Sequence, residues 1–177
     1  MKTLSEIKEW AIQQHADTNH TYGEENHPYS YHLENVYWTA LSFNESIPSV
    51  FKEVVYDACW CHDLIEDARV TYNDIVAATG SEMLADIVYA LTNEKGKNRA
   101  ERAGDKYYEG IRNTPFASFV KLCDRIANVS YSKSQGTDSR MFKNYVKEMD
   151  HFIENVKDDA SNCDLSKLIN HLKSLII

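Results

Sequence analysis

Hydrophobic residues recur every three or four positions along most of the chain, and no stretch alternates strictly between apolar and polar residues as a half-buried strand would. Thr3 with Glu6, and Thr71 with Asp74, form capping-box patterns that mark two helix starts. Gly80 is expected to end the short helix that follows Thr71. Further helices are predicted over residues 32–43, 48–64, 81–91, 98–112, 116–131, 139–156 and 164–175.

The segment 18–31 is polar and rich in Tyr and His, and we predict a loop there. No linker is long enough to separate two domains, and no internal repeat is visible. We therefore predict one all-α domain over residues 1–177, in which the C-terminal segment 163–175 packs on the rest.

The composition limits what the chain can do. Its 177 residues are 43% hydrophobic and include only six Gly and three Pro, which excludes a disordered or collagen-like protein. Nineteen basic residues against 27 acidic ones give a net charge of −8, a poor match for duplex nucleic acid, although a small phosphorylated ligand needs only a local cationic patch.

The cellular setting follows from the apolar runs and the cysteines. No apolar run approaches the roughly 18 residues of a membrane span, and the N-terminus lacks the apolar stretch of a signal peptide. Cys59 and Cys61 would point about 200° apart on a helix and are interpreted as structural thiols. We expect a cytoplasmic protein with reduced cysteines that binds neither membranes nor nucleic-acid polymers.

The segment around residue 62 places ionisable groups on an apolar face. Phe51, Val55, Ala58 and His62 recur at helical spacing, and Asp63 follows at once. Burying a carboxylate is costly unless it is paired or binds a metal, so this pair needs a partner. An imidazole–carboxylate hydrogen bond or a surface helix end would also satisfy it.

Glu66 and Asp67 follow one turn later, and they would share a side with His62 and Asp63 if the helix continues. Three carboxylates this close repel one another, and a divalent cation would relieve that repulsion. A solvated acidic helix end is the alternative, although acids are unfavourable at that end of the helix dipole.

The apolar helix predicted over residues 116–131 carries one narrow polar strip, because Lys121, Asp124, Arg125 and Asn128 share an arc of about 100°. Such a strip is either an exposed face with its own salt bridges or the lining of a site for a metal ion and a phosphate. The remaining histidines are interpreted as ordinary loop or surface residues: His15, His20, His27, His151 and His171.

Taken in order, His32, His62-Asp63 and Asp124 resemble the H…HD…D signature of the HD-domain metal-dependent phosphohydrolases. Over about residues 5–150 the chain is similar to the alarmone (guanosine tetraphosphate) hydrolase branch of that family. The ordered blocks that carry the resemblance are Pro28-Tyr29-Ser30-Tyr31-His32, His62-Asp63-Leu64-Ile65-Glu66-Asp67, Thr71-Tyr72-Asn73-Asp74-Ile75 with Gly80 and Ala90-Leu91-Thr92, and Lys121-Leu122-Cys123-Asp124-Arg125-Ile126-Ala127-Asn128.

This resemblance implies an HD-type helical bundle with a metal site in its middle. It implies that one divalent cation, usually Mn²⁺ in this branch, is ligated by His32, His62, Asp63 and Asp124. Two imidazoles and two carboxylates also suit Fe, Co or Zn. The resemblance further implies that Glu66 and Asp67 are the catalytic carboxylates.

Four residues are predicted to contact the substrate. The resemblance places Asn128 at the ribose or phosphate end of the nucleotide and Tyr145 at its base or ribose. Lys121 and Arg125 could neutralise developing negative charge, and Arg125 could equally serve a structural ion pair.

One part of the family pattern is absent. The alarmone hydrolases carry an Arg-Lys pair ahead of the first metal-binding His, and counting back from His32 without gaps gives Thr21-Tyr22 there. No Lys or Arg occurs from residue 12 to residue 44, and the loop offers Glu24 and Glu25 instead. A nucleotide with fewer phosphates would accommodate this departure, as would cations from elsewhere: Arg69, Lys95, Lys97, Arg140 or Lys143.

The leading hypothesis is a guanosine 3′,5′-bis(diphosphate) 3′-pyrophosphohydrolase-like enzyme with a single metal ion. In it, Glu66 and Asp67 position the attacking water and exchange its proton. A second hypothesis is an HD-type phosphatase for another small phosphate ester, such as a nucleoside monophosphate or NADPH. A third is a non-enzymatic nucleotide-binding protein, which would be expected to lack a metal ligand or one of Glu66 and Asp67, and neither is lost here.

Overall fold

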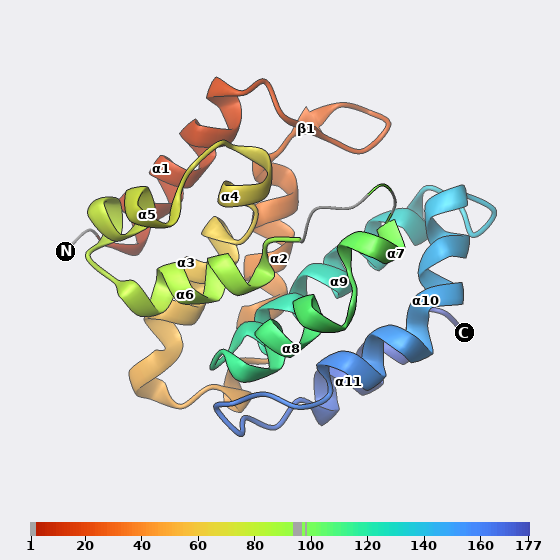
Figure 1. The fold of residues 1–177 in the computed structure, drawn as a ribbon. Coiled ribbons are helices and arrows are strands. Elements are labelled where there is room, and N and C mark those ends of the chain that lie inside the picture. The colour runs from red at the N-terminus through yellow and green to blue at the C-terminus, as the bar shows by residue number, and fades with distance from the viewer. Residues whose placement is uncertain (1–2, 94–96, 98) are drawn as a thin grey trace.

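The helices are arranged around one long, largely buried helix. The computed structural model describes residues 3–93, 97 and 99–177, and in it α9 (Ala117–Ser134) packs against α2 (Ser30–Ser42), α10 (Arg140–Val156) and α11 (Ser166–Ser174) (Figure 1). A single cluster of buried hydrophobic side chains runs through these contacts. The all-α prediction is confirmed, and α11 packs against α9.

The remaining elements surround this centre. Helix α3 (Lys52–Cys61) packs on α2 and on α1 (Leu4–Asp17), and α5 (Tyr72–Thr79) packs on α6 (Glu82–Leu91). The shorter elements are α4 (Leu64–Asp67), α7 (Arg99–Arg102), α8 (Asp105–Asn113) and the 3-10 turns η1 (Asn44–Ser46) and η2 (Ser49–Phe51). None of the helices in the described part of the chain is long and apolar enough to cross a membrane.

The predicted helix ends form as the sequence indicates. The capping boxes at Thr3 and Thr71 are both present, with each side-chain oxygen accepting from the backbone N–H three residues on. Gly80 ends α5 with φ +72°, a left-handed conformation that favours glycine.

The single helix predicted over residues 48–64 is wrong, because the chain leaves the helical path at His62 and Asp63 and resumes it as α4. Successive residues on a regular helix point about 100° apart. The interruption instead brings Nε2 of His62 to 2.9 Å from Oδ2 of its own neighbour, Asp63. The break is thus what allows two adjacent side chains to meet at one point.

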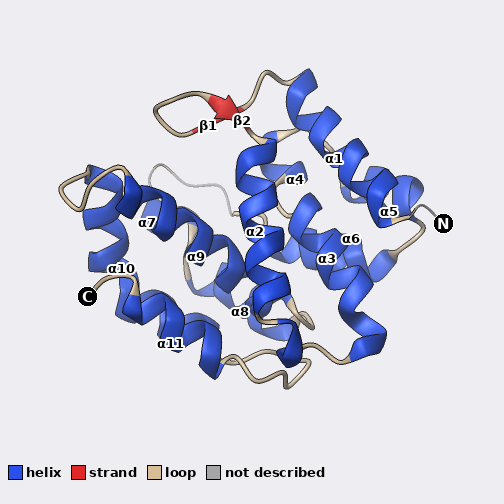
Figure 2. Ribbon diagram, turned by 180° about the vertical axis from the view of Figure 1, so that it is seen from behind, coloured by secondary structure: helices blue, strands red, loops and turns tan. Residues whose placement is uncertain are grey.

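Two other predictions are corrected. The helix predicted over 98–112 is divided into α7 and α8, and Asn98 lies outside the described residues. The predicted loop 18–31 contains a hairpin of two-residue strands, β1 (Thr21–Tyr22) and β2 (His27–Pro28), with Tyr22 paired to His27. Strands this short carry no alternation that a sequence pattern could reveal. Figure 2 shows the hairpin beyond the N-terminal end of α2.

The start of α9 is held by a buried acid from the segment that follows α10. Phe116, the residue before α9, has φ +65°, and its backbone N–H donates to Oδ1 of Asp159 at 2.8 Å. The N–H of Ser118 donates to Oδ2 of the same carboxylate at 3.0 Å. An acid is the favoured partner for the free N–H groups and the dipole at a helix N-terminus.

Replacing Asp159 by Ala should therefore lower the free energy of unfolding by about 2–3 kcal/mol, because buried N–H groups lose their acceptor. Urea denaturation followed by circular dichroism measures this. The neighbouring exposed acid supplies the matched control, since Asp158→Ala should change stability by less than about 0.5 kcal/mol. Equal effects of the two substitutions would contradict this role for Asp159.

Candidate functional site

Three buried side chains from distant parts of the sequence converge in the centre of the bundle. His32 comes from the first turn of α2, His62 from the end of α3 and Asp124 from the middle of α9. One ligand atom from each lies within 4.8 Å of the other two. The Nε2 atoms of the two histidines are 3.3 Å apart, and Nε2 of His32 is 3.3 Å from Oδ1 of Asp124.

Asp63 adds a fourth donor to this group. Its Oδ2 atom lies 2.9 Å from Nε2 of His62 and 3.7 Å from Nε2 of His32. The four residues predicted as metal ligands are therefore brought together, and we call them the ion cluster. Two imidazole nitrogens and two carboxylates facing one point form a donor set that could hold a divalent metal ion.

The imidazole of His62 is oriented from behind. Its Nδ1 atom is 2.9 Å from the backbone carbonyl of Cys59, so Nδ1–H donates to that carbonyl and Nε2 faces the cluster. A backbone carbonyl or carboxylate in this position is the usual support of a metal-binding histidine.

The charges of the ion cluster balance one another in the metal-free protein. Burial alone would lower the pKa of His62, but Asp63 and Asp124 outweigh it and raise that pKa to about 9. Burial opposes ionisation of Asp124, yet Lys121 and the two histidines hold its pKa well below the usual range. Nζ of Lys121 donates to Oδ2 of Asp124 at 2.9 Å. The ionised carboxylates of Asp63 and Asp124 are therefore stabilised by positive charge next to them.

The two predicted catalytic carboxylates lie next to the cluster. Burial, followed by the nearby charges of Asp63 and Glu66, raises the pKa of Asp67 to about 7. The hydroxyl of Tyr29 donates to Oδ2 of Asp63 at 2.5 Å and lies 3.4 Å from Oδ2 of Asp67. Nδ2 of Asn93 lies 2.9 Å from each oxygen of the Glu66 carboxylate, which fixes its orientation.

A cavity of about 300 Å³ opens beside Asp124, with Glu66 on its wall. All four residues predicted to contact the substrate, Lys121, Arg125, Asn128 and Tyr145, line it. The other lining residues are Asn93, Arg102, Ala103, Tyr107, Tyr108, Glu148 and His151. The cations proposed from elsewhere in the chain, Arg69, Lys97, Arg140 and Lys143, do not line it, and Lys95 lies outside the described residues.

Arg125 forms the structural ion pair that the sequence left open. Its Nη1 atom is 3.4 Å from Oε2 of Glu148. Its guanidinium group lies 4.0 Å from the ring centre of Phe152 and 4.9 Å from that of Tyr145. Arg125 therefore ties α9 to α10 while its polar end borders the cavity.

The interpretation of His15 as a loop or surface residue is wrong. His15 is 1% exposed on α1, and its ring stacks on Tyr29 at 4.4 Å. It follows Ile7 and Ala11 at helical spacing on the buried face of α1. The same continuation of an apolar stripe identified His62, so the signal was available in the sequence.

His20 is also part of the surroundings of the ion cluster. Its ring stacks on Tyr29 at 4.1 Å with an interplanar angle of 17°, and its Nδ1 atom is 3.7 Å from Oδ2 of Asp67. No sequence pattern identified this contact, because His20 lies in an irregular segment after α1 and reaches the site only through tertiary packing.

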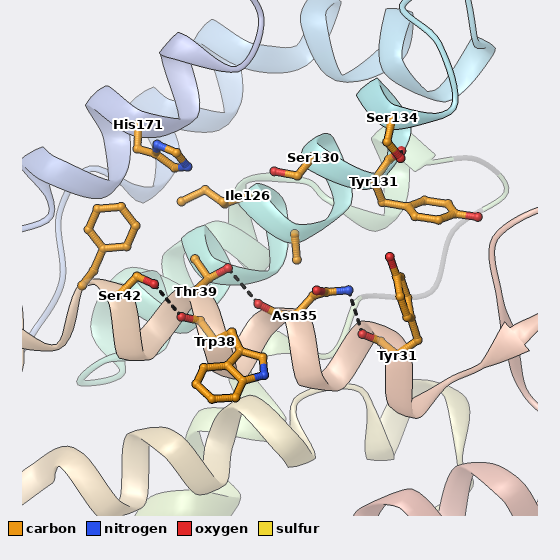
Figure 3. A pocket seen from close by; sticks show the side chains of 12 residues that line it. Tyr31, Asn35, Trp38, Thr39, Ser42, Ile126, Ser130, Tyr131, Ser134 and His171 are labelled. Carbon is orange, nitrogen blue, oxygen red and sulfur yellow. Dashed lines mark hydrogen bonds between the residues drawn. The ribbon is translucent and has the colours of Figure 1, made fainter.

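A second cavity, of about 460 Å³, lies between α2, α9 and α11 (Figure 3). The hydroxyls of Thr39 and Ser42 on its wall donate to the backbone carbonyls of Asn35 and Trp38 in their own helix. None of the described residues that line this cavity is Asp, Glu, Lys or Arg. Charged side chains instead gather at the cavity of about 300 Å³ beside Asp124.

A solved structure has a fold similar to that of this chain. No protein-family model matches the sequence, and no curated protein matches it. Among solved structures, the chain is similar to a metazoan ortholog of SpoT that hydrolyzes ppGpp and plays a role in starvation responses. That similarity has a TM-score of 0.71 and 22% sequence identity, covering 97% of this chain and 92% of the other. The chain thus has an HD-type, alarmone-hydrolase-like fold, as the sequence predicted.

The ion cluster should bind one Mn²⁺ per chain, measured by metal analysis after dialysis. We expect His32→Ala and Asp63→Ala to weaken binding by at least about a hundredfold, because each removes a donor that faces the shared point. His27→Ala removes an imidazole outside the cluster and should leave the stoichiometry at one. Full metal content in a folded Asp63→Ala protein would show that the ion is held elsewhere.

The metal-free protein should lose stability in acid through His15. Burial lowers the pKa of His15 from 6.5 to about 4, although Asp63 partly opposes the shift. Between these values the unfolded chain binds a proton that the folded chain does not, so stability falls as the pH decreases. From pH 6.5 to pH 5 the loss should be about 2 kcal/mol.

Urea denaturation at these two pH values measures the loss. His15→Leu keeps an apolar side chain on the same face and cannot titrate, so the variant should lose correspondingly less stability over this interval. The same loss in the wild type and in His15→Leu would contradict the assignment.

Proposed function

We propose that this chain is a metal-dependent phosphohydrolase that acts on a phosphorylated nucleotide. The observation that carries the proposal is the convergence of His32, His62, Asp63 and Asp124 beside a polar cavity of about 300 Å³. The similarity to a ppGpp-hydrolyzing protein supports a hydrolase through the fold.

The four residues of the ion cluster would hold one divalent cation, for which Mn²⁺ is our first choice and Fe, Co or Zn are alternatives. When bound, such a cation polarises a phosphoryl oxygen and lowers the pKa of water. His32, His62 and Asp124 are buried and Asp63 is half-buried, and the Cys59 carbonyl supports His62, so the donors are positioned before any ligand binds.

Glu66 and Asp67 would take the proton from the attacking water and return it to the leaving group. A carboxyl group whose pKa lies at about 7 can accept a proton from water and return it to a leaving group near neutral pH, and Asp67 meets this condition. Glu66 borders the cavity and is held by Asn93, so it is placed to orient the attacking water. Lys121, beside Asp124, would stabilise negative charge that develops on the phosphoryl group.

Two substrate classes are candidates. The first is guanosine 3′,5′-bis(diphosphate), cleaved with release of pyrophosphate, which the fold similarity favours. The second is a nucleotide or other small ester with a single phosphate, cleaved with release of orthophosphate. The absence of Lys and Arg from residue 12 to residue 44 favours the second class, because a substrate with two diphosphate arms needs more cations around it.

A panel of phosphate esters assayed with added Mn²⁺, with pyrophosphate and orthophosphate measured separately, tests the activity. Glu66→Gln should retain the metal and lower kcat by roughly 10²- to 10⁴-fold, the usual contribution of acid–base catalysis. Glu9→Gln, an exposed acid on α1, should match the wild type. Failure of the metal-loaded wild type to hydrolyse any ester would refute the enzyme proposal.

A further inference from the structure

The β1–β2 hairpin covers one side of the ion cluster with an aromatic ring. The ring of Tyr22 lies nearly parallel to the imidazole of His32, with centres 4.7 Å apart and an interplanar angle of 15°. The hydroxyl of Tyr22 donates to Oδ1 of Asn128 at 2.9 Å. Tyr22 thus spans from a proposed metal ligand on α2 to a proposed substrate contact on α9.

The amide of Asn128 is engaged at both ends by these contacts. Its Oδ1 atom accepts from Tyr22, and its Nδ2 group donates to Oδ1 of Asp124. Asn128 lines the cavity, whereas Tyr22 does not. The cavity borders Asn128 together with residues of α10, such as Tyr145. Tyr22 contacts the same amide but does not line the cavity.

The hairpin is anchored in this position. Gly23 has φ +73°, and a Cβ atom at this residue would collide with the ring and hydroxyl of Tyr131 on α9. The ring of Tyr22 is also in contact with Tyr131, with centres 4.8 Å apart. The turn therefore packs directly on α9. The Tyr22 ring is held between His32 on α2 and Tyr131 on α9.

The charges on the two sides of the site differ. The hairpin carries no Lys or Arg and exposes Glu24 and Glu25. The cations Arg102, Lys121 and Arg125 all line the cavity. A phosphate group is bound by charge-assisted hydrogen bonds from such cations. The cavity supplies such cations, and the hairpin supplies no Lys or Arg.

We infer that Tyr22 is a specificity-determining residue whose ring closes the hairpin side of the site, so that the favoured substrate carries a single phosphorylated arm and enters through the cavity. A second arm on the hairpin side would have to displace the ring and would meet carboxylates instead of cations. This inference rests on the proposed function and selects the second of its two substrate classes.

Kinetics on paired substrates test the inference. The ratio of kcat/KM for guanosine 3′,5′-bis(diphosphate) to kcat/KM for guanosine monophosphates is measured with Mn²⁺ for the wild type, Tyr22→Ala and Tyr22→Phe. Tyr22→Ala opens the hairpin side, so the ratio should rise by at least about tenfold. Tyr22→Phe keeps the ring and removes only the hydroxyl, so the ratio should stay within roughly threefold of the wild type.

Binding provides a readout that does not depend on turnover. Isothermal titration of the EDTA-treated full chain with guanosine 3′,5′-bis(diphosphate) should show an affinity about tenfold higher in Tyr22→Ala than in the wild type. Tyr22→Lys should bind more tightly still, because it adds a permanent cation to a hairpin that has no Lys or Arg. Circular dichroism establishes that each variant is folded.

The two proposals fail in distinguishable ways. If no wild-type activity is found, the proposed function fails, while the titration still tests Tyr22. Unchanged affinity in both folded variants, Tyr22→Ala and Tyr22→Lys, would overturn the role of Tyr22 even if the wild type is an active phosphohydrolase. A shift in the substrate ratio or in the affinity toward the two-armed nucleotide in Tyr22→Ala, absent in Tyr22→Phe, supports it.

Discussion

The burial of like-charged carboxylates beside two imidazoles is the constraint on which the rest of this molecule depends. Asp63 and Asp124 face the same point in the interior, and ionised groups are costly there unless positive charge compensates them. The metal-free protein supplies that charge through His62 and through Lys121, which donates to Asp124. A divalent cation would supply more of it from one position, and α2, α3 and α9 are packed so that their donors face that position.

The fold gives the two sides of this centre different properties. On one side, the interruption between α3 and α4 turns Glu66 toward a polar cavity that three cationic side chains border. On the other side, the hairpin places the aromatic ring of Tyr22 against His32 and contains no Lys or Arg. Under the proposed function, the phosphate of the substrate would meet these three cations from the cavity side. The asymmetry lies in side chains, so a shared helical bundle can serve substrates with different numbers of phosphates.

The sequence predicted those features that local patterns encode. The capping boxes at Thr3 and Thr71 and the helical period of α9 follow from interactions within a few residues. The ordered motifs identified the four donors and the four predicted substrate contacts that line the cavity. The hairpin was not predicted because two-residue strands have no period. The break at His62 was not predicted because it depends on tertiary packing around the ion cluster and not on a local pattern. His15 was misjudged although it continues the buried stripe of α1, since a lone histidine is usually a surface residue.

Anomalous diffraction from crystals of the protein grown with Mn²⁺ tests the central claim most directly. A single strong peak is predicted within coordination distance, roughly 2.0–2.6 Å, of Nε2 of His32 and of His62 and of one oxygen each of Asp63 and Asp124. A Mn²⁺ peak bound by other residues, or no peak among these four side chains at saturating Mn²⁺, would contradict the account.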